Sequence, residues 1–271
     1  MALRFSPALQ NFIAQRGSWK DFFDNGSIEI YTGAQPATPD LAVSGTNLVI
    51  ITVGAATKTS EVKATGVLTI SGTTSGTIDT CTLTGIDLLN GAVTHTGDHN
   101  TTATAVALKI NRNPANKLVV ASSTGASGVV TLTAVPGLGN EFNAEALTFT
   151  STTCTTAVTS TTFGSGTGGG VAGVNGANGL KMDYNAAAGV FTKDTTQTWS
   201  GTAIGAGTQT AGWFRYISSI ADPGTTDSSA IYLRMDGSIA TSGADMNMSS
   251  TSITNGALQT ISTFQLTVPA A

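Results

Sequence analysis

The stretch Ile28-Glu29-Ile30-Tyr31 alternates apolar and polar side chains, the pattern of a strand with one buried face. A second apolar run, residues 48–53, predicts another strand after a turn-rich connection. Thr and Val are abundant along the chain, and 32 glycines supply positions for tight turns. Branched side chains suit a pleated surface, so this composition favours strands over helices. We therefore predict a mainly β protein with a β-sandwich-like outer domain.

Two short helices are predicted ahead of the first strand. Ser6 followed by Pro7 is typical of a helix start, and Ser18 with Asp21 approximates a capping box for a second helix. Short amphipathic helices are marginal alone, so we expect both to pack on a sheet or on a neighbouring subunit. Their apolar residues are Leu9, Phe12, Ile13, Trp19, Phe22 and Phe23.

The amino-acid composition changes in the middle of the chain. Residues 55–170 contain no Trp or Tyr, are rich in Thr, and end in a Gly-rich run at residues 164–170 that is typical of a flexible linker. We predict that residues 55–170 form an inserted module. Residues 1–54 and 171–271 would then complete one discontinuous outer β domain.

The module is predicted to be a small ββ-α-ββ domain. Asp98 and Asn100 mark a helix start, Ala103, Val106, Ala107 and Ile110 give the spacing of a buried face, and Pro114 forbids continuation. The flanking strands are expected in two pairs, each around a turn. The pairs are residues 67–70 with 80–83, and residues 129–134 with 146–150 around Pro136 and Gly139.

Composition and charge exclude several function classes. Only 10% of residues are charged, with 2 His and 2 Cys, so the side chains on which acid/base and metal chemistry depend are scarce. The net charge of −4 and the scattered Lys and Arg residues give no footprint for nucleic acid. No signal-peptide pattern and no run of about 20 apolar residues is present. We expect a soluble, non-enzymatic protein that binds neither nucleic acid nor a membrane and needs no cofactor.

Short motifs in both flanks resemble small virion structural proteins of tailed bacteriophages. The middle is similar to a β-rich module of phage tail and fibre proteins at residues 91–110 and 128–133. The motifs of the flanks are LRFS at 3–6, GS at 17–18, NG at 25–26, IEIYTGAQP at 28–36, AAGV at 187–190, WSG at 199–201, AGWFR at 211–215, RMDGS at 234–238 and GAD at 243–245.

The resemblance implies an assembly component and supplies no catalytic residue. It implies a homo-oligomer, a trimer or a larger ring, that meets other virion proteins at the capsid surface, neck, collar or tail and is made in the host bacterial cytoplasm. The alternative is a receptor- or carbohydrate-binding fibre module that grips a host glycan. A glycan-cleaving enzyme would need a carboxylate pair in a cleft, and Asp79 and Asp87 lie in a module without aromatic subsites.

One cluster resembles a metal site. His95, Asp98 and His99 form H-x-x-D-H and could present nitrogen and oxygen ligands. The run precedes the predicted helix, where an Asp is favoured as a cap, so we interpret it as a helix start and expect no metal.

Two other patterns have structural explanations. Gly164, Gly166 and Gly169 match a nucleotide-binding spacing, but more Gly follows where a helix should begin, so we interpret the run as a linker. Cys81 and Cys154 are expected in strands, as two buried free thiols or, alternatively, as a disulfide.

Large apolar residues and one Arg are the candidates for subunit contacts. In a strand, Trp213 and Arg215 share one face while Phe214 and Tyr216 share the other, so one face is expected in the core and the other could meet a partner. The N-terminal helices carry more aromatic surface than they can bury between themselves. The candidate interface residues are Phe5, Phe12, Trp19, Phe22, Phe23, Trp213 and Arg215.

Overall fold

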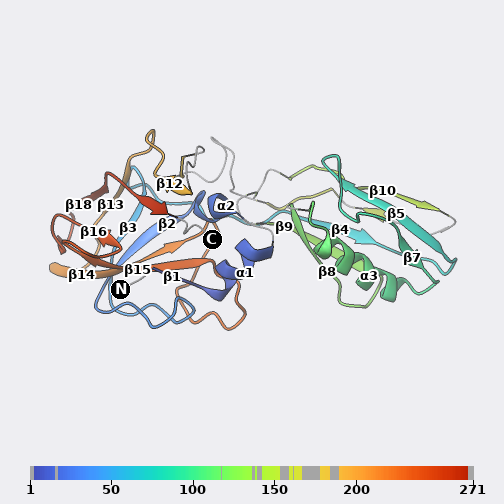
Figure 1. Cartoon of the computed structure of the whole chain (residues 1–271), viewed down its shortest axis with the longest axis horizontal. Helices are drawn as coiled ribbons and strands as arrows, with labels where there is room; N and C mark the ends of the chain where they lie inside the picture. The colour runs from blue at the N-terminus through green and yellow to red at the C-terminus, as the bar shows by residue number, and fades with distance from the viewer. Residues whose placement is uncertain are drawn as a thin grey trace. The chain divides into compact units, whose positions relative to one another are not determined.

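A computed structural model confirms a mainly β protein, with 40% strand and 12% helix (Figure 1). It describes residues 3–15, 18–116, 118–135, 138, 142–152, 159–160, 162–166, 178–183 and 189–267. The chain divides into two compact units, Met1–Glu61 with Ala172–Ala271 (unit 1) and Val62–Val171 (unit 2). None of the helices in these ranges is long and apolar enough to cross a membrane.

Unit 1 is built on one nine-stranded sheet. Its central path runs in the order β1, β15, β14, β2, β3, β13, β18, and all neighbours on that path are antiparallel. Two short strands pair beside the path, and a separate two-stranded sheet also belongs to the unit. The path consists of β1 (Arg4–Phe5), β15 (Arg234–Ala240), β14 (Thr208–Ile217), β2 (Ser27–Thr32), β3 (Asn47–Val53), β13 (Trp199–Thr202) and β18 (Leu258–Ile261). The others are β16 (Met246–Asn247) on β15, β17 (Ser252–Thr254) on β14, and the pair β12 (Val190–Thr192) with β19 (Gln265–Thr267).

The two N-terminal helices begin where their caps predict. Helix α1 spans Pro7–Gln15, and the Ser6 hydroxyl accepts the Leu9 amide at 3.2 Å. Helix α2 spans Trp19–Phe23, with both hydrogen bonds of the Ser18 capping box formed. Ser6 is fully buried and also donates to the carbonyl of Tyr232, so it joins the helix start to the chain beside β15.

One face of the large sheet, the core face, carries the hydrophobic core of unit 1. Ile28, Ile30, Phe214 and Tyr216 point to this face, against the helices and the C-terminal strands. Tyr216 anchors the cluster, since its ring lies 5.0 Å from that of Phe23 and its hydroxyl donates to the Phe23 carbonyl at 2.5 Å. The second layer is therefore made of α1, α2 and the C-terminal segment, and no second sheet of comparable size appears among the described residues.

The described residues of unit 2 form two four-stranded sheets and helix α3 (His99–Arg112). The helix packs against strands of both sheets, and the expected face, Ala103, Val106, Ala107 and Ile110, is buried. One sheet holds β5 (Gly76–Leu83), β6 (Ile86–Asp87), β7 (Val93–His95) and β10 (Thr148–Thr152). The other holds β4 (Thr65–Thr69), β8 (Val119–Ser122), β9 (Val129–Ala134) and β11 (Thr159–Ser160).

The strand pairing in unit 2 differs from the sequence-based expectation. The predicted strands and helix are present, but β4 pairs with β9 and β5 pairs with β10. The expected pairs of neighbours, β4 with β5 and β9 with β10, are thus split between the two sheets. The physical reason is that β8 forms a hairpin with β9, and β6 and β7 fold back on β5, using edges that the predicted hairpins required. Pro136 and Gly139 lie outside the described residues.

The first junction between the units lies after Glu61, seven residues beyond the predicted position. Residues 55–61 belong to unit 1 because they are fastened to the chain that follows β14. Lys58 Nζ donates to the Ser218 carbonyl at 2.8 Å, and the Glu61 amide donates to the Ser219 carbonyl at 2.8 Å.

Candidate functional site

The face of the unit 1 sheet opposite the core carries a row of alternating charges. Strand register pairs Arg4 with Asp236, Asp236 with Arg215, and Arg215 with Glu29. Directly paired residues project to the same face of a sheet, so these four side chains lie side by side across four strands. Ile50 on β3 continues the row, and from there the row is uncharged.

Arg215 and Asp236 form the centre of this row. The guanidinium donates to the carboxylate through two bonds of 2.7 Å, from Nε to Oδ1 and from Nη2 to Oδ2. Both residues have no exposed surface. Burial raises the pKa of the Asp236 carboxyl, and the hydrogen bonds from Arg215 oppose that rise. The pair is a bidentate, desolvated ion pair, in which removing either partner leaves an uncompensated buried charge.

A loop, residues 33–46, lies over this charged half of the sheet and is called here the strap loop. It is held through its main-chain carbonyls by side chains of β1, β14 and β15. The bonds run from Arg4 to the Pro36 carbonyl, from Arg215 to the Leu41 carbonyl at 3.3 Å, from Arg234 to the Pro39 carbonyl at 3.0 Å, and from Trp213 Nε1 to the Ser44 carbonyl at 3.2 Å. Three guanidiniums and one indole thus fix the path of the loop.

The last turn of the strap loop depends on glycine. Gly45 has φ +80°, and a Cβ there would lie 2.1 Å from the Thr32 carbonyl oxygen. A second loop is fastened beside it, because Arg234 also makes two 2.6 Å bonds to Asp222 and a 2.8 Å bond to the Thr225 carbonyl. Arg234 is fully buried, and its hydrogen bonds connect β15 to both loops.

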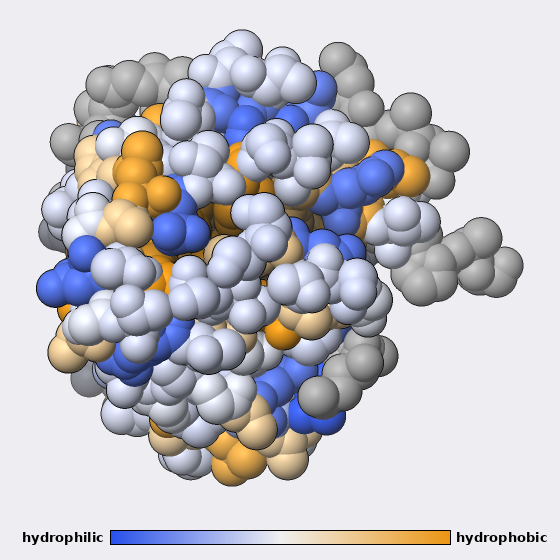
Figure 2. All heavy atoms as spheres, turned by 90° about the vertical axis from the view of Figure 1, so that its left-hand side faces the viewer, coloured by the Kyte–Doolittle hydropathy of each residue, from blue (hydrophilic) through white to orange (hydrophobic). Residues whose placement is uncertain are grey.

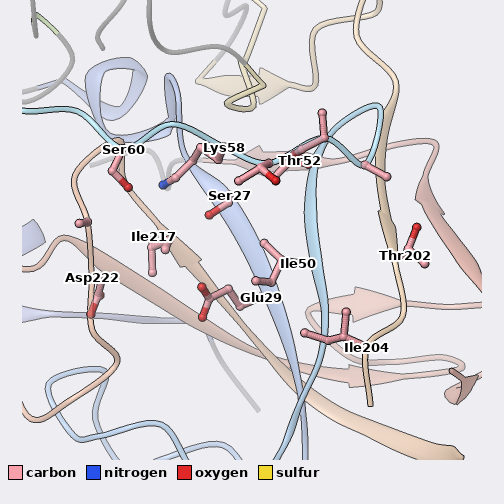
Figure 3. A pocket seen from close by; sticks show the side chains of 14 residues that line it. Ser27, Glu29, Ile50, Thr52, Lys58, Ser60, Thr202, Ile204, Ile217 and Asp222 are labelled. Atoms are coloured by element: carbon pink, nitrogen blue, oxygen red, sulfur yellow. Dashed lines mark hydrogen bonds between the residues drawn. The ribbon is translucent and has the colours of Figure 1, made fainter. Parts of the chain in front are cut away.

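The half of the same face that the strap loop does not cover contains a pocket of about 420 Å³. Figure 3 shows Lys58 on the segment that crosses β2, while Glu29 and Ile50 project from the strands into the same hollow. Ile204 and Thr202 complete the wall on the β13 side. The pocket thus combines an apolar wall with one amine, that of Lys58, and two carboxylates, those of Glu29 and Asp222.

The environment of Lys58 changes its acidity. Burial lowers the pKa of the Lys58 ammonium to about 8, and the nearby carboxylates of Glu29, Asp222 and Glu61 only partly oppose the change. Burial likewise raises the pKa of Glu29, against the hydrogen bond that Glu29 accepts from the Tyr31 hydroxyl. The lowered pKa leaves a substantial fraction of neutral amine at mild pH, which raises the nucleophilicity of Lys58.

The structure brings together some of the predicted interface residues and separates others. Trp213 and Arg215 do share a face, but the strap loop of the same chain covers them, and both are fully buried. Phe22 and Phe23 are also fully buried, in the core of unit 1. These four side chains lie inside unit 1 and not at its surface. We therefore assign them to the fold of unit 1 and no longer to a subunit interface.

Phe5, Phe12 and Trp19 remain partly exposed around the N-terminal helices. Trp19 lies between Phe5, at a ring distance of 5.1 Å, and Phe23, at 6.4 Å. They are the members of the predicted set that can still contact another molecule.

The H-x-x-D-H cluster is a helix start in the structure. Asp98 is the N-cap of α3 and accepts the amides of Asn100 and Thr101. His95 is fully buried in β7, where its Nδ1 lies 2.8 Å from the Thr102 hydroxyl. That hydroxyl donates to the Asp98 carbonyl at 2.7 Å, so it accepts from His95 and fixes the proton on Nδ1. Across the described residues, no group of three His, Cys, Asp or Glu side chains could hold a metal ion.

The other sequence patterns fall into unit 2. Cys81 is a buried free thiol, and burial raises its pKa to about 12. Cys154 and Gly169 lie outside the described residues. Asp79 accepts hydrogen bonds from Thr77 and Thr152, and Asp87 accepts the amides of Cys81 and Leu89, so both carboxylates have structural partners.

Sequence reasoning missed Arg234, Asp222 and Lys58. A signal existed for Arg234, since Arg234 and Asp236 stand two apart in β15 and must therefore share a face. Lys58 stands in a stretch of Ala, Thr and Ser that carries no such signal. Comparison with known proteins adds no assignment, because no protein-family model, curated protein or solved structure matches the chain.

Proposed function

We propose that this chain is a structural component of a tailed-phage virion, a non-catalytic homo-oligomer of the capsid surface, neck, collar or tail. The observation that carries the proposal is that several of the few charged side chains of unit 1 hold its loops and strands together. Arg4, Arg215 and Arg234 all bind main-chain carbonyls of the strap loop, and two of them also bind buried carboxylates. These side chains stabilise the fold of unit 1, and few other charged side chains remain that could take part in catalysis.

The placement of the phage-like motifs supports the same proposal. The segments LRFS, IEIYTGAQP, AGWFR and RMDGS come from distant parts of the sequence, and they contribute β1, β2, β14, β15 and the start of the strap loop. Asp245, in the GAD segment, accepts the amide and the hydroxyl of Ser238. Four of the phage-like segments therefore meet in the charged half of one sheet, where they form a scaffold for the strap loop.

The surface of the chain also suits an assembly component. Figure 2 shows one face of the chain covered largely by side chains of intermediate hydropathy, with separated hydrophilic and hydrophobic patches among them. With only 10% of its residues charged, the chain offers a partner little long-range electrostatic attraction, so its contacts would depend mainly on shape.

Labelling of intact particles tests the proposal. Antibody raised against the recombinant chain is applied to purified particles of the phage that encodes it, and gold label is located by electron microscopy. Label over the whole capsid means decoration, and label at one vertex means neck, collar or tail. Label at the tips of fibres, together with binding of the chain to host cells or host glycans, would favour the receptor-binding alternative. Particles without any label would overturn the proposal.

A further inference from the structure

Strand β18 forms one edge of the large sheet of unit 1. Within the residues that the structure describes, β18 pairs with β13 alone. Its residues alternate between exposed and half-buried, and Leu258 is 63% exposed. An edge strand offers a row of unpaired N–H and C=O groups to a strand from another chain.

This end of the sheet lacks charged side chains, proline and bulges, three of the features by which proteins block an edge. Residues 195–214, which include β13, and residues 246–271, which include β18, contain no Asp, Glu, Lys or Arg. No proline interrupts β18, and its pairing with β13 runs without a bulge. Lysine, proline and bulges are the common protections against pairing between molecules.

The opposite edge of the same sheet is protected. Strand β1 has only two residues, one of them Arg4, and Pro7 begins helix α1 directly after it. The contrast between the two edges points to β18 as the one that pairs with another molecule.

We propose that β18 pairs antiparallel with β18 of a second copy of this chain, about a two-fold axis, so that one sheet continues through two subunits. The occupant follows from the lack of charge. Symmetric antiparallel pairing places each residue opposite itself or a near neighbour in the partner, so a charged strand would meet its own charge. A charge-free strand meets no such repulsion, and the exposed Leu258 side chains of both copies would lie on the same face of the joint.

The inference rests on the proposed self-assembly and names one contact surface within it, a two-fold contact that pairs two subunits. The first test compares Thr260→Lys with Thr226→Lys, because both threonines are exposed in unit 1 and both variants gain the same charge. Sedimentation over a wide concentration range measures the dimer dissociation constant. Thr260→Lys should raise the constant about tenfold or more, since two ammonium groups then face each other near the axis, and Thr226→Lys should leave it unchanged.

Cysteine scanning locates the axis. Single cysteines at positions 258–262 are oxidised in solution, with Thr226→Cys and the unsubstituted chain as controls. Pairing about a two-fold axis requires one position to form the intermolecular disulfide fastest, with rates falling on either side, because only Cα atoms about 4.4–6.8 Å apart can be bridged.

Two results would overturn the pairing. One is an oligomer whose dissociation constant does not respond to Thr260→Lys, which would mean assembly through another surface and would leave the virion proposal intact. The other is a chain that stays monomeric at every concentration, with cross-linking at 258–262 no faster than at 226. The gold-labelling experiment is independent of both, so failure of the pairing is distinguishable from failure of the proposed function.

Discussion

Replacing Arg215 with Met should destabilise the charged half of the unit 1 sheet and release the strap loop from Arg215. Methionine keeps much of the length and apolar volume of the side chain but removes both bonds to Asp236 and the contact with the Leu41 carbonyl. Asp236 would remain fully buried without its partner. The expected result is a large loss of stability confined to unit 1.

The magnitude follows from the geometry of the pair. Each of the two 2.7 Å charge-assisted bonds is worth about 1.5–3 kcal/mol. Breaking a buried pair on one side typically costs about 3–5 kcal/mol, and the two figures agree. With a urea slope of about 2 kcal/mol per molar for a domain of this size, the unfolding midpoint should fall by about 1.5–2.5 M.

Tryptophan fluorescence measures this unfolding selectively. The 3 Trp residues, Trp19, Trp199 and Trp213, all belong to unit 1, so unit 2 is silent in the assay. Arg112→Met, in the exposed last turn of α3, removes a guanidinium from unit 2 and serves as the control for an effect confined to unit 1; it should leave the midpoint of the tryptophan transition unchanged. The double variant Arg215→Met with Asp236→Leu should recover most of the loss, because it removes the stranded charge.

The pH dependence supplies a second readout of the same variant. Without the guanidinium, burial should raise the pKa of Asp236 further above its unfolded value of about 3.9. A carboxyl with a raised folded-state pKa destabilises the fold once it ionises, so the loss in Arg215→Met should be full at pH 7.5 and shrink as the pH falls through the raised pKa. A loss under about 1 kcal/mol, or a loss that the Asp236→Leu change does not relieve, would refute this account of the pair.

Three further predictions test other parts of the structure. Gly26→Ala should cost about 2 kcal/mol or more in the same assay, because its Cβ would lie 2.3 Å from Tyr216 Cε1; a neutral effect would contradict the packing of β2 on β14. Acylation of Lys58 by an amine-reactive ester, followed by peptide mass spectrometry, should level off above pH 8, about two units below an ordinary lysine, and a profile that still climbs at pH 10 would show that its amine is not buried. Deleting Val62–Val171 should leave unit 1 with an unchanged tryptophan unfolding curve, whereas a non-cooperative curve would mean that the units share one core.

Much of the local structure could be predicted because it is decided by near neighbours in the sequence. The helix starts at Ser6, Ser18 and Asp98 and the buried face of α3 depend only on residues within a few turns. The faces of β14 were assigned correctly for the same reason, since alternation is a local property. What covers the face of Trp213 and Arg215 was beyond this reasoning, because a loop about 170 residues earlier in the chain lies over them.

The strand pairing of unit 2 and the Lys58 pocket could not be predicted from the sequence, for a related reason. Thr-rich strands in unit 2 have similar compositions, so nothing in them distinguishes β9 from β5 as the partner of β4. The Lys58 pocket needs the crossing segment 55–61 to be fastened at Ser218 and Ser219, which are contacts between remote parts of the sequence. The general alternation of the strands was therefore predictable, while register and the face-covering loops were not.

The strap loop is recognised by its backbone. Every bond from Arg4, Trp213, Arg215 and Arg234 to residues 36–44 ends on a carbonyl oxygen, a group that every amino acid carries. Ala37, Thr38, Leu41, Ala42 and Ser44 are exposed between these anchoring points. The loop can therefore exchange its outward side chains over evolutionary time while its path stays the same, which gives the protein a surface that can diversify at little cost in stability.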